Sequence, residues 1–364
     1  MVKFLHAADF HLDSPFAALN ARQAAARRRE SRELPLRMAN YVNAHEIPLV
    51  LLAGDLFDGD APYAETIRAL ADALGQMNAQ VFISPGNHDR FTETSPYRTA
   101  EWPENVHIFK ESAMTAADVP ELGVRVYGAA FTAQEQNESL LAGFTAPQDG
   151  ISIGLLHGEL DTPDSRYDPL TRAEVAASGL TYLALGHIHK RQEPIRCGGT
   201  LCAWPGCPEG RGFDELGEKG FYEGEIADGG KVTLTFVPFA RRRYEILEVD
   251  VTGREPRAAA EAALPAETAA HLYRILLTGE TDERGADAAA IREALCDRFY
   301  ALDVRDCTRM AQPVWDRAGE DSLRGLFLAE LKKKLDAART DEEREQITRA
   351  ARFGLAALDH RDLG

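Results

Sequence analysis

The chain has 364 residues, a net charge of −17, 45% hydrophobic residues and 27% charged residues. This length exceeds the size at which one hydrophobic core usually stops growing, so we expect two or three domains. The acidic balance argues against a uniformly basic surface for nucleic-acid binding. No apolar run approaches the ~18 residues of a membrane span, and the first residues lack a secretory signal. We therefore expect a cytoplasmic protein without a membrane segment.

The first predicted strand covers residues 2–8 and ends at Asp9 and His11. Side chains at positions i and i+2 of an extended chain point the same way, so this pair forms half of a metal site if the strand continues. Taken alone, the pair is also typical of polar groups that contact solvent at a strand end.

Residues 17–46 form the next predicted element, a helix that carries the most basic stretch of the chain. Pro35 is expected to end or kink this helix, because proline removes a backbone donor and clashes with the preceding turn. The arginines are expected either to line a solvated face or to contact a phosphate backbone beside the site. They are Arg22, Arg27, Arg28, Arg29, Arg32 and Arg37.

Two strands with polar ends follow, separated by a helix. Residues 49–53 predict a buried strand that opens into Gly54 and Asp55, and residues 64–77 predict a helix. Residues 81–84 predict the next strand, which ends in Gly86-Asn87-His88-Asp89. Alternating strands and helices are typical of a parallel sheet, whose carboxyl edge gathers such polar turns.

The same pattern continues along the chain. Strands are predicted at 106–109, 124–129, 151–156 and 182–185, with a short helix at 172–178. The strand at 151–156 ends at His157, and the strand at 182–185 ends at His187 and His189. Five of the ten histidines therefore lie at predicted strand ends.

This concentration predicts a metal site with more than one ion. Two aspartates, one asparagine and four imidazoles exceed the needs of one ion, and their mixed N and O character suits Mn²⁺, Fe²⁺ or Zn²⁺ better than Mg²⁺ or Ca²⁺. Two ions that share one carboxylate, typically ~3.5–4 Å apart, would use all of these ligands for an in-line displacement at phosphorus. The predicted ligands are Asp9, His11, Asp55, Asn87, His157, His187 and His189.

His88 and Asp89 complete the predicted site. His88 follows the ligand Asn87 but is not needed for metal binding, so we predict that it protonates or stabilises the leaving oxygen. Asp89 is predicted to hold the His88 ring in the useful tautomer.

Five segments resemble, in order and spacing, the motifs of the calcineurin-like metallophosphoesterases. They are Asp9-Phe10-His11, Gly54-Asp55-Leu56-Phe57-Asp58, Gly86-Asn87-His88-Asp89, His157-Gly158 and Gly186-His187-Ile188-His189. The longer strings from Phe4 to Phe16 and from Pro205 to Arg211 are similar to the SbcD and YhaO branch of bacterial DNA repair exonucleases. The resemblance covers residues 1–250 and implies an α/β fold, the metallophosphoesterase αββα sandwich of two mixed β-sheets flanked by helices.

The resemblance also implies how the site is divided. One ion would be held by Asp9, His11, Asp55 and His189, and the other by Asp55, Asn87, His157 and His187, with Asp55 as the bridge. Manganese is the implied metal, and His88 matches the family's leaving-group histidine. Phosphoprotein phosphatases carry a glutamate where Asp89 stands, so Asp89 favours phosphodiesters. The implied partners are DNA, an SbcC-like coiled-coil ABC ATPase and a second copy of the chain.

The last third of the chain has a different pattern. Residues 220–227 and 231–239 predict a hairpin that supplies a second β layer. The arginine triplet 241–243 is expected to be a junction or a phosphate contact. Strands at 244–250 and 272–278 and helices at 258–270 and 286–299 indicate a small α/β capping domain. Helices at 322–338 and from a capping box at Thr340 either pack on their own domain or dock the ATPase.

We therefore expect a nuclease domain at 1–240, a capping domain for DNA access at 241–318, and C-terminal helices at 319–364. The five cysteines lack zinc-site spacing and are expected to be reduced thiols, with Cys197, Cys202 and Cys207 in an irregular turn.

The expected function is that of a two-metal phosphodiesterase that hydrolyses DNA as an exonuclease in DNA repair, together with the ATPase. A small-molecule phosphoesterase acting on nucleotides or cyclic nucleotides is the rival enzyme. An inactive adaptor for the ATPase is the rival from another class.

Overall fold

The computed structural model describes residues 1–358, which form two units, the first covering Met1–Arg243 and the second beginning at Tyr244. Each unit has its own buried hydrophobic clusters. The predicted functional division into 1–240, 241–318 and 319–364 stays a prediction, and residues 359–364 of its last segment lie outside the described residues.

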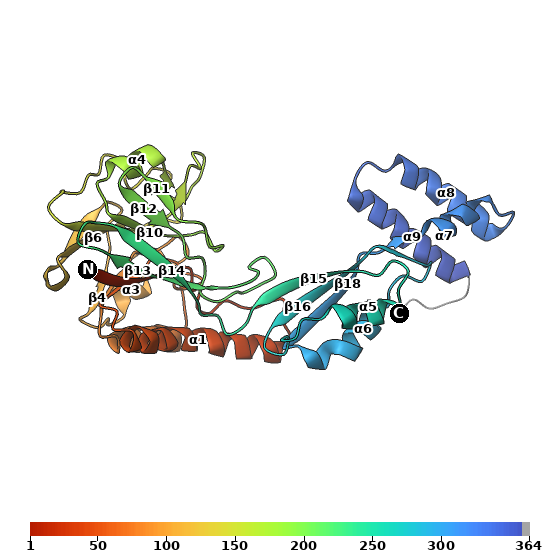
Figure 1. Ribbon diagram of the computed structural model, residues 1–364, viewed down its shortest axis with the longest axis horizontal. Helices are drawn as coiled ribbons and strands as arrows, with labels where there is room; N and C mark the ends of the chain where they lie inside the picture. The colour runs from red at the N-terminus through yellow and green to blue at the C-terminus, as the bar shows by residue number, and fades with distance from the viewer. Residues whose placement is uncertain (359–364) are drawn as a thin grey trace. The chain divides into compact units, whose positions relative to one another are not determined.

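The first unit contains two six-stranded mixed sheets (Figure 1). Within the first sheet, β1 to β4 are parallel neighbours, and β13 joins β1 in an antiparallel pairing. The order of the first sheet is β14 (Val232–Pro238), β13 (Gly220–Ile226), β1 (Val2–Ala7), β2 (Leu49–Leu52), β3 (Gln80–Ile83) and β4 (Val106–Ile108). The order of the second sheet is β11 (Ile195–Cys197), β12 (Thr200–Ala203), β10 (Tyr182–Gly186), β7 (Ile151–His157), β6 (Val124–Gly128) and β5 (Thr115–Val119).

Few helices accompany these sheets. The first unit has α1 (Ala21–Ala44), α2 (Ala64–Gly75), the short α3 (Pro96–Thr99), a 3₁₀ turn η1 (Pro120–Leu122) and α4 (Arg172–Ala177). A separate pair of two-residue strands, β8 (Glu159–Leu160) and β9 (Pro169–Leu170), lies beyond β7.

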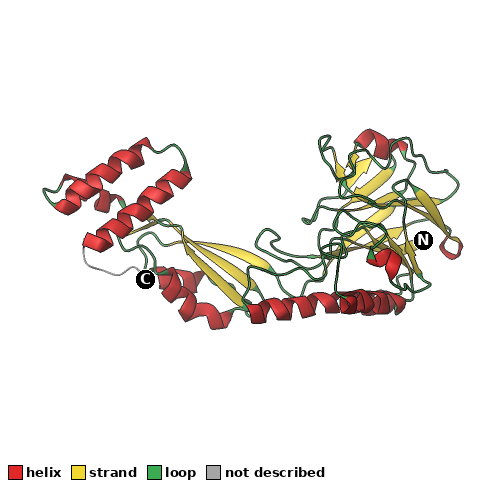
Figure 2. Cartoon of the chain, turned by 180° about the vertical axis from the view of Figure 1, so that it is seen from behind, coloured by secondary structure: helices red, strands yellow, loops and turns green. Residues whose placement is uncertain are grey.

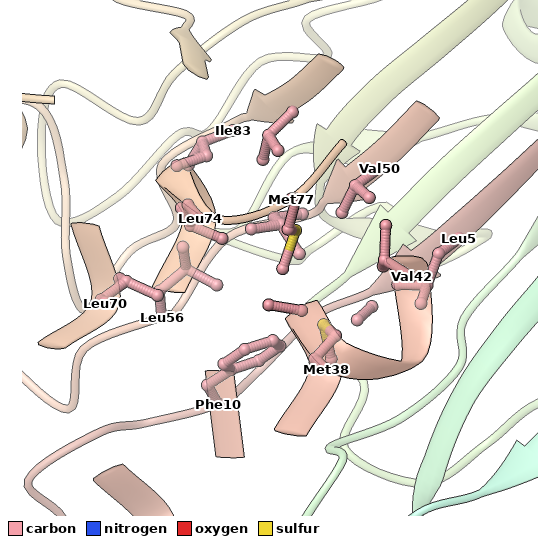
Figure 3. Close-up of a cluster of buried hydrophobic side chains, with 14 of the residues drawn as sticks. Leu5, Phe10, Met38, Val42, Val50, Leu56, Leu70, Leu74, Met77 and Ile83 are labelled. Atoms are coloured by element: carbon pink, nitrogen blue, oxygen red, sulfur yellow. The ribbon is translucent and has the colours of Figure 1, made fainter. Parts of the chain in front are cut away.

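Alternating side chains place each sheet between two apolar layers, because successive residues of a strand point to opposite faces. Along β1, Leu5 belongs to the cluster that includes Met38 of α1 and Leu74 of α2, as Figure 3 shows. The neighbouring Phe4 instead contacts the cluster that contains Tyr182 of the second sheet. The two sheets therefore pack face to face, as the sequence predicted.

The outer face of the second sheet carries the fourth layer. Val175 of α4 lies in one buried cluster with Leu183 and Leu185 of β10. Helices thus cover the outer face of both sheets, and the predicted αββα sandwich is confirmed.

Two predictions about the strands were wrong. The hairpin β13–β14 extends the first sheet through β1 and does not supply the second layer, which is built by β5–β7 and β10–β12. Cys197 and Cys202 lie in the β11–β12 hairpin rather than in an irregular turn, and Thr200 is the register partner of Cys197. Short strands of this kind carry too few residues for a clear alternating pattern.

Helix α1 also departs from its prediction. It does not end at Pro35, which is buried within the helix, while the predicted alternative of a kink there stays a prediction. Arg27 is fully buried and bonded to carboxylates, so it belongs neither to a solvated face nor to a phosphate-binding surface. Asn20 caps the helix by accepting a hydrogen bond from Gln23 N.

The second unit begins with a parallel three-stranded sheet, β15 (Tyr244–Asp250), β16 (Leu272–Thr278) and β18 (Ala301–Asp306). Helices α5 (Pro256–Ala263) and α6 (Ala288–Leu295) share its buried cluster. Helix α5 ends earlier than predicted, just before Pro265. A 3₁₀ turn η2 (Cys296–Arg298) and the two-residue strands β17 (Glu280–Thr281) and β19 (Arg309–Met310) complete this small α/β layer.

The remaining helices form a second cluster of their own. They are α7 (Gln312–Asp316), the 3₁₀ turn η3 (Arg317–Gly319), α8 (Leu323–Ala337) and α9 (Asp341–Leu358), and Figure 2 shows α8 and α9 in red. The predicted capping box is confirmed, because Thr340 Oγ1 accepts from Glu343 N while Glu343 accepts from Thr340 N. Phe327 of α8 packs into the cluster, whereas Leu323 and Leu326 are 70% and 68% exposed.

Within residues 1–358, none of the helices combines the length and the apolar character needed to cross a bilayer.

Candidate metal centre

The polar side chains predicted from the sequence meet at the carboxyl ends of five strands of the first unit. Asp9 and His11 follow β1, Asp55 follows β2, and Asn87 follows β3. His157 is the last residue of β7, and His187 and His189 follow β10. The two sheets thus supply ligands to one place, as expected where the carboxyl ends of parallel strands meet.

The first group of donor atoms belongs to Asp9, His11, Asp55 and His189, whose ligand atoms all lie within 4.8 Å of one another. His11 Nε2 lies 3.1 Å from His189 Nε2 and 3.6 Å from Asp55 Oδ2. These residues are those that the resemblance assigns to one ion.

The second group contains Asp55, His157 and His187, again with ligand atoms within 4.8 Å. His157 Nε2 lies 3.3 Å from Asp55 Oδ2 and 3.0 Å from Asn87 Oδ1. His187 Nδ1 lies 3.2 Å from the same Asn87 oxygen. Asn87 therefore joins this group, and Asp55 is common to both groups.

The donor atoms fit divalent cations for a physical reason. Asp9 Oδ2 is buried and has no hydrogen-bond partner, which is costly for a carboxylate oxygen. His11 Nε2 and His189 Nε2 face each other, so without a cation two ring lone pairs meet unless one nitrogen carries a proton. A cation between these groups would satisfy the bare oxygen and both nitrogens.

Backbone strain accompanies the ligands. Asp9, His11, Asp55 and His187 have φ values of 57°, 43°, 51° and 87°, in the left-handed region that non-glycine residues rarely adopt. Gly54 precedes Asp55 with φ 81°, and a Cβ at this position would lie 2.6 Å from His157 Nδ1. Such strain gathers at functional sites, where surrounding packing holds it in place.

Each candidate imidazole has an oxygen behind its other ring nitrogen. His189 Nδ1 lies 2.8 Å from Glu215 Oε1, whereas His11 Nδ1 lies 3.1 Å from Asp58 Oδ1 without forming a hydrogen bond to it. His157 Nδ1 lies 2.9 Å from the Ala53 carbonyl, and His187 Nε2 lies 3.0 Å from Glu159 Oε1. Acceptors in these places orient metal-binding histidines and raise their basicity.

From the sequence, none of the three side-chain acceptors, Asp58, Glu159 and Glu215, was assigned a role, although Asp58 stands in one of the quoted motifs. Glu159 lies two residues after His157, and its position was a usable signal. Glu215 lies far from the histidine motifs in the sequence, and its only signal was the neighbouring segment Pro205 to Arg211, which the resemblance singled out without giving it a role.

His88 lies at the edge of the site. Its backbone N donates to Asp55 Oδ1 at 2.9 Å, and its ring meets the His11 ring edge-on with centroids 4.8 Å apart. Its side chain is exposed, so it can reach a substrate. His88 Nδ1 lies 3.3 Å from the Asp58 carbonyl oxygen.

The contacts of Asp89 correct its predicted role. The partner of the His88 ring is the Asp58 carbonyl, and the Asp89 carboxylate is occupied elsewhere. Asp89 accepts hydrogen bonds from Tyr97 Oη at 2.6 Å and from the backbone N–H groups of Asp55, Leu56, Phe57 and Gly86. A residue next to His88 in sequence was an obvious partner, but its side chain turns inward and ties the loop after β2 to the loop after β3.

Charge within the site shifts the pKa values of its members. Burial alone would raise the pKa of Asp55, but the neighbouring His157 and His11 hold it well below its usual range. Burial opposes charge on His157, yet Asp55 and Asp9 raise its pKa to about 9. Burial and the nearby His157 lower the pKa of His187 to about 3. Burial also raises the pKa of Asp9, and Glu215 raises the pKa of His189 against the effect of burial, so a cation would compete with protons at His157, Asp9 and His189.

Comparison with known proteins agrees with this site. Residues 2–191 match the family described as "Calcineurin-like phosphoesterase", and the chain belongs to this family.

Three relatives have sequences similar to that of this chain. The chain is 32% identical over 261 residues to "Uncharacterized metallophosphoesterase YhaO" of Bacillus subtilis, which covers 68% of this chain and 63% of the relative. It is 24% identical over 276 residues to "DNA double-strand break repair protein Mre11" of Methanopyrus kandleri, covering 69% and 60%. It is 25% identical over 284 residues to the SbcD subunit of the SbcCD nuclease of Staphylococcus epidermidis, covering 68% and 73%. The matched region spans less than two thirds of the length of the first two relatives.

Proposed function

We propose that the protein is a two-metal phosphodiesterase that hydrolyses DNA, an SbcD-like exonuclease of DNA repair that acts with an SbcC-like coiled-coil ATPase. The observation that carries the two-metal part is the pair of ligand groups that share Asp55. Support for DNA as the substrate comes from relatives whose names describe a component of a nuclease and a double-strand break repair protein.

The proposed ligand assignment follows the two groups. Asp9, His11, Asp55 and His189 hold one cation, and Asp55, Asn87, His157 and His187 hold the other, with Mn²⁺ as the proposed metal. When bound, such a pair of ions acidifies water and stabilises negative charge on a phosphoryl group during displacement. The strained strand ends keep the ligand atoms close together before any cation arrives.

His88 is the proposed proton donor to the leaving oxygen. Its Nδ1–H can donate to the Asp58 carbonyl, which leaves Nε2 directed away from that contact. An imidazolium at this position can protonate the leaving oxygen through Nε2 and so avoid release of a free alkoxide. Asp89 serves a different purpose in this proposal, since it holds the loop that carries Asp55.

The partners and location belong to the same proposal. A DNA repair nuclease acts where the DNA lies, so we propose a cytoplasmic protein that forms homodimers and binds the ATPase through its C-terminal helices. The exposed Leu323 and Leu326 on α8 are compatible with such docking.

The first test is cleavage of end-labelled duplex DNA with Mn²⁺, compared with nucleotide and cyclic nucleotide esters at equal enzyme concentration. We expect the duplex to be degraded from its ends and the small esters to react slowly. Preference for the small esters would replace DNA with a small-molecule substrate. A purified protein that binds no Mn²⁺ would instead favour the inactive adaptor.

A variant ties the activity to the site. His88→Ala should lower kcat by ~10²–10⁴-fold, because it removes a general acid, while Mn²⁺ content stays at the wild-type value. Mn²⁺ content is measured on the same preparation by atomic emission. Full activity of His88→Ala would exclude His88 as the proton donor without excluding the metal site.

A further inference from the structure

The segment that follows β12 packs against the backbone of His189. Cys207 N donates to the His189 carbonyl oxygen at 3.1 Å, and Lys219 Nζ donates to the same oxygen at 3.1 Å. Gly206 has φ 77°, and a Cβ there would lie 2.6 Å from this oxygen, so the close approach requires glycine. The segment from Gly206 to Lys219 is therefore held at both ends by the backbone carbonyl of His189, a candidate ligand.

Glu215 acts on the ring of the same histidine. Its side chain is only 4% exposed, and its Oε1 lies 2.8 Å from His189 Nδ1. The opposite nitrogen, His189 Nε2, faces His11 in the first ligand group. Arg211 Nη2 also lies 2.9 Å from His189 Nδ1. A cation on Nε2 requires the ring proton to be on Nδ1, so the guanidinium must then donate to Glu215 rather than to the ring, and Glu215 accepts the ring proton.

Arg211 links Glu215 to a second histidine. Its Nη2 lies 2.7 Å from Glu215 Oε1, and its Nη1 lies 3.1 Å from Asp58 Oδ1. The same Asp58 oxygen lies 3.1 Å from His11 Nδ1. One guanidinium therefore joins the carboxylates behind both imidazoles of the first group, His11 and His189.

The second ligand group has separate support. His157 is oriented by the Ala53 carbonyl and His187 by Glu159, and neither acceptor contacts Arg211 in the described hydrogen bonds and ion pairs. The two groups share Asp55 but not the residues behind their histidines.

We propose that Arg211 and Glu215 are positioning residues that set the cation affinity of the first ligand group without setting that of the second. Arg211 keeps Glu215 charged and ordered, and Glu215 keeps the lone pair of His189 Nε2 available for the cation. This inference rests on the two-metal part of the proposed function, but it does not depend on the substrate.

The test is a Mn²⁺ titration of the full chain, in which electron paramagnetic resonance reports free Mn²⁺ and the coupled signal of a bound pair. Wild-type protein should bind two equivalents. Glu215→Gln removes the charge at nearly constant size, and we expect one equivalent to weaken by ~10–100-fold while the other is unchanged. Glu159→Gln should weaken the other equivalent, so the double variant should weaken both.

Glu209→Gln is the matched control. Glu209 lies in the same segment and is also buried, but its carboxylate bonds Arg27 and the backbone of Arg241 rather than a histidine. This control should lower the melting temperature in EDTA and leave both Mn²⁺ affinities unchanged. A purely structural role of the segment would make Glu209→Gln and Glu215→Gln alike.

The outcomes separate the proposals. Wild-type Mn²⁺ affinity at both sites in folded Glu215→Gln would overturn the inference, and so would equal weakening in the Glu209→Gln control. If Glu215→Gln does not fold, Arg211→Lys is judged by the same criterion, since it keeps the charge but loses the fork that bridges Asp58 and Glu215. Two tight sites without DNA cleavage would refute the nuclease alone, whereas fewer than two sites in wild-type protein would refute the two-metal part and this inference together.

Discussion

Two buried charged clusters of the first unit differ in how completely their members are paired. The Arg27 cluster consists of Arg27, Glu30, Glu209 and Arg242. Arg27 bonds Glu30 at 2.7 Å and Glu209 at 2.9 Å, and Arg242 bonds Glu30 at 2.6 Å. Both carboxylates therefore meet a guanidinium, and the cluster fastens α1 to the segment that carries Glu209.

In the ligand cluster at the strand ends, the polar groups are incompletely paired. Asp9 Oδ2 has no partner, two ring nitrogens face each other, and within the two ligand groups no arginine or lysine balances the carboxylates. Both carboxylates of the Arg27 cluster meet a guanidinium, although Arg27 Nε has no hydrogen-bond partner, whereas the carboxylates of the other cluster would meet a full positive charge only if cations bind there. Pairing, rather than burial or charge alone, thus separates the structural cluster from the candidate site.

The largest expected effect comes from removing one unpaired carboxylate of the ligand cluster. Asp9→Asn keeps the oxygen that accepts from His187 N but removes the negative charge, so Mn²⁺ binding to the first group should be lost. Activity should fall by ~10³-fold or more, because a metal ion supplies several kcal/mol to phosphoryl displacement. The metal-free protein should become more stable by ~1 kcal/mol or more, since a buried carboxylate that lacks a lysine or arginine partner is replaced by a neutral amide.

Urea unfolding in EDTA and phosphodiesterase assays measure the two effects on the same preparation. A loss of stability in Asp9→Asn would contradict the claim that this cluster is incompletely paired.

The next effect concerns the paired cluster. Arg27→Met removes the cation that serves both Glu30 and Glu209, and it should destabilise the protein by ~3–5 kcal/mol, as expected for breaking a buried ion pair from one side. Combining it with Glu30→Gln and Glu209→Gln should recover part of this loss, because no uncompensated charge is then left. Chemical denaturation in EDTA measures both, and Mn²⁺ affinity of the folded variant should stay unchanged.

A smaller effect is expected from His6, a buried histidine of β1 that contacts Tyr182 Oη at 2.8 Å. Burial lowers the pKa of His6 to about 3, against an ordinary value of 6.5. Between pH 6.5 and pH 3, His6 is therefore protonated in the unfolded chain and neutral in the folded chain, so the free energy of unfolding decreases as the pH falls toward 3. At pH 5 this group should cost ~2 kcal/mol of stability.

The comparison of wild type with His6→Gln isolates this contribution, because other groups contribute equally to both proteins. The difference in unfolding free energy between the two proteins should shift by ~2 kcal/mol from pH 7 to pH 5 in EDTA. A difference that is independent of pH would show that His6 is not kept neutral by the fold.

The candidate ligands could be located from the sequence because they follow buried strands, and a strand leaves a clear apolar pattern before its polar end. The five predicted strand ends meet as expected, and the αββα layers are confirmed. Partners distant in sequence could not be predicted in this way. Glu215 and Arg211 reach His189 only through the packing of a long loop, and Arg27 looked like part of a solvated basic face until its carboxylate partners were known.

Predictions made from adjacent residues were wrong where the tertiary structure decides the direction of a side chain or the pairing of a strand. Asp89 follows His88 directly, yet successive side chains of an irregular turn need not point the same way, and Asp89 turns toward backbone amides. The hairpin β13–β14 was predicted correctly as a hairpin, but its alternating pattern fits an edge of either sheet, so only the tertiary pairing with β1 decides its place.

The inward turn of Asp89 has a consequence for metal exchange. Because five donors converge on this one carboxylate, the bend that presents Asp55 is held by the protein's own hydrogen bonds and does not depend on a cation. A cation that binds there would therefore find Asp55 already in place and would not have to reorder this bend.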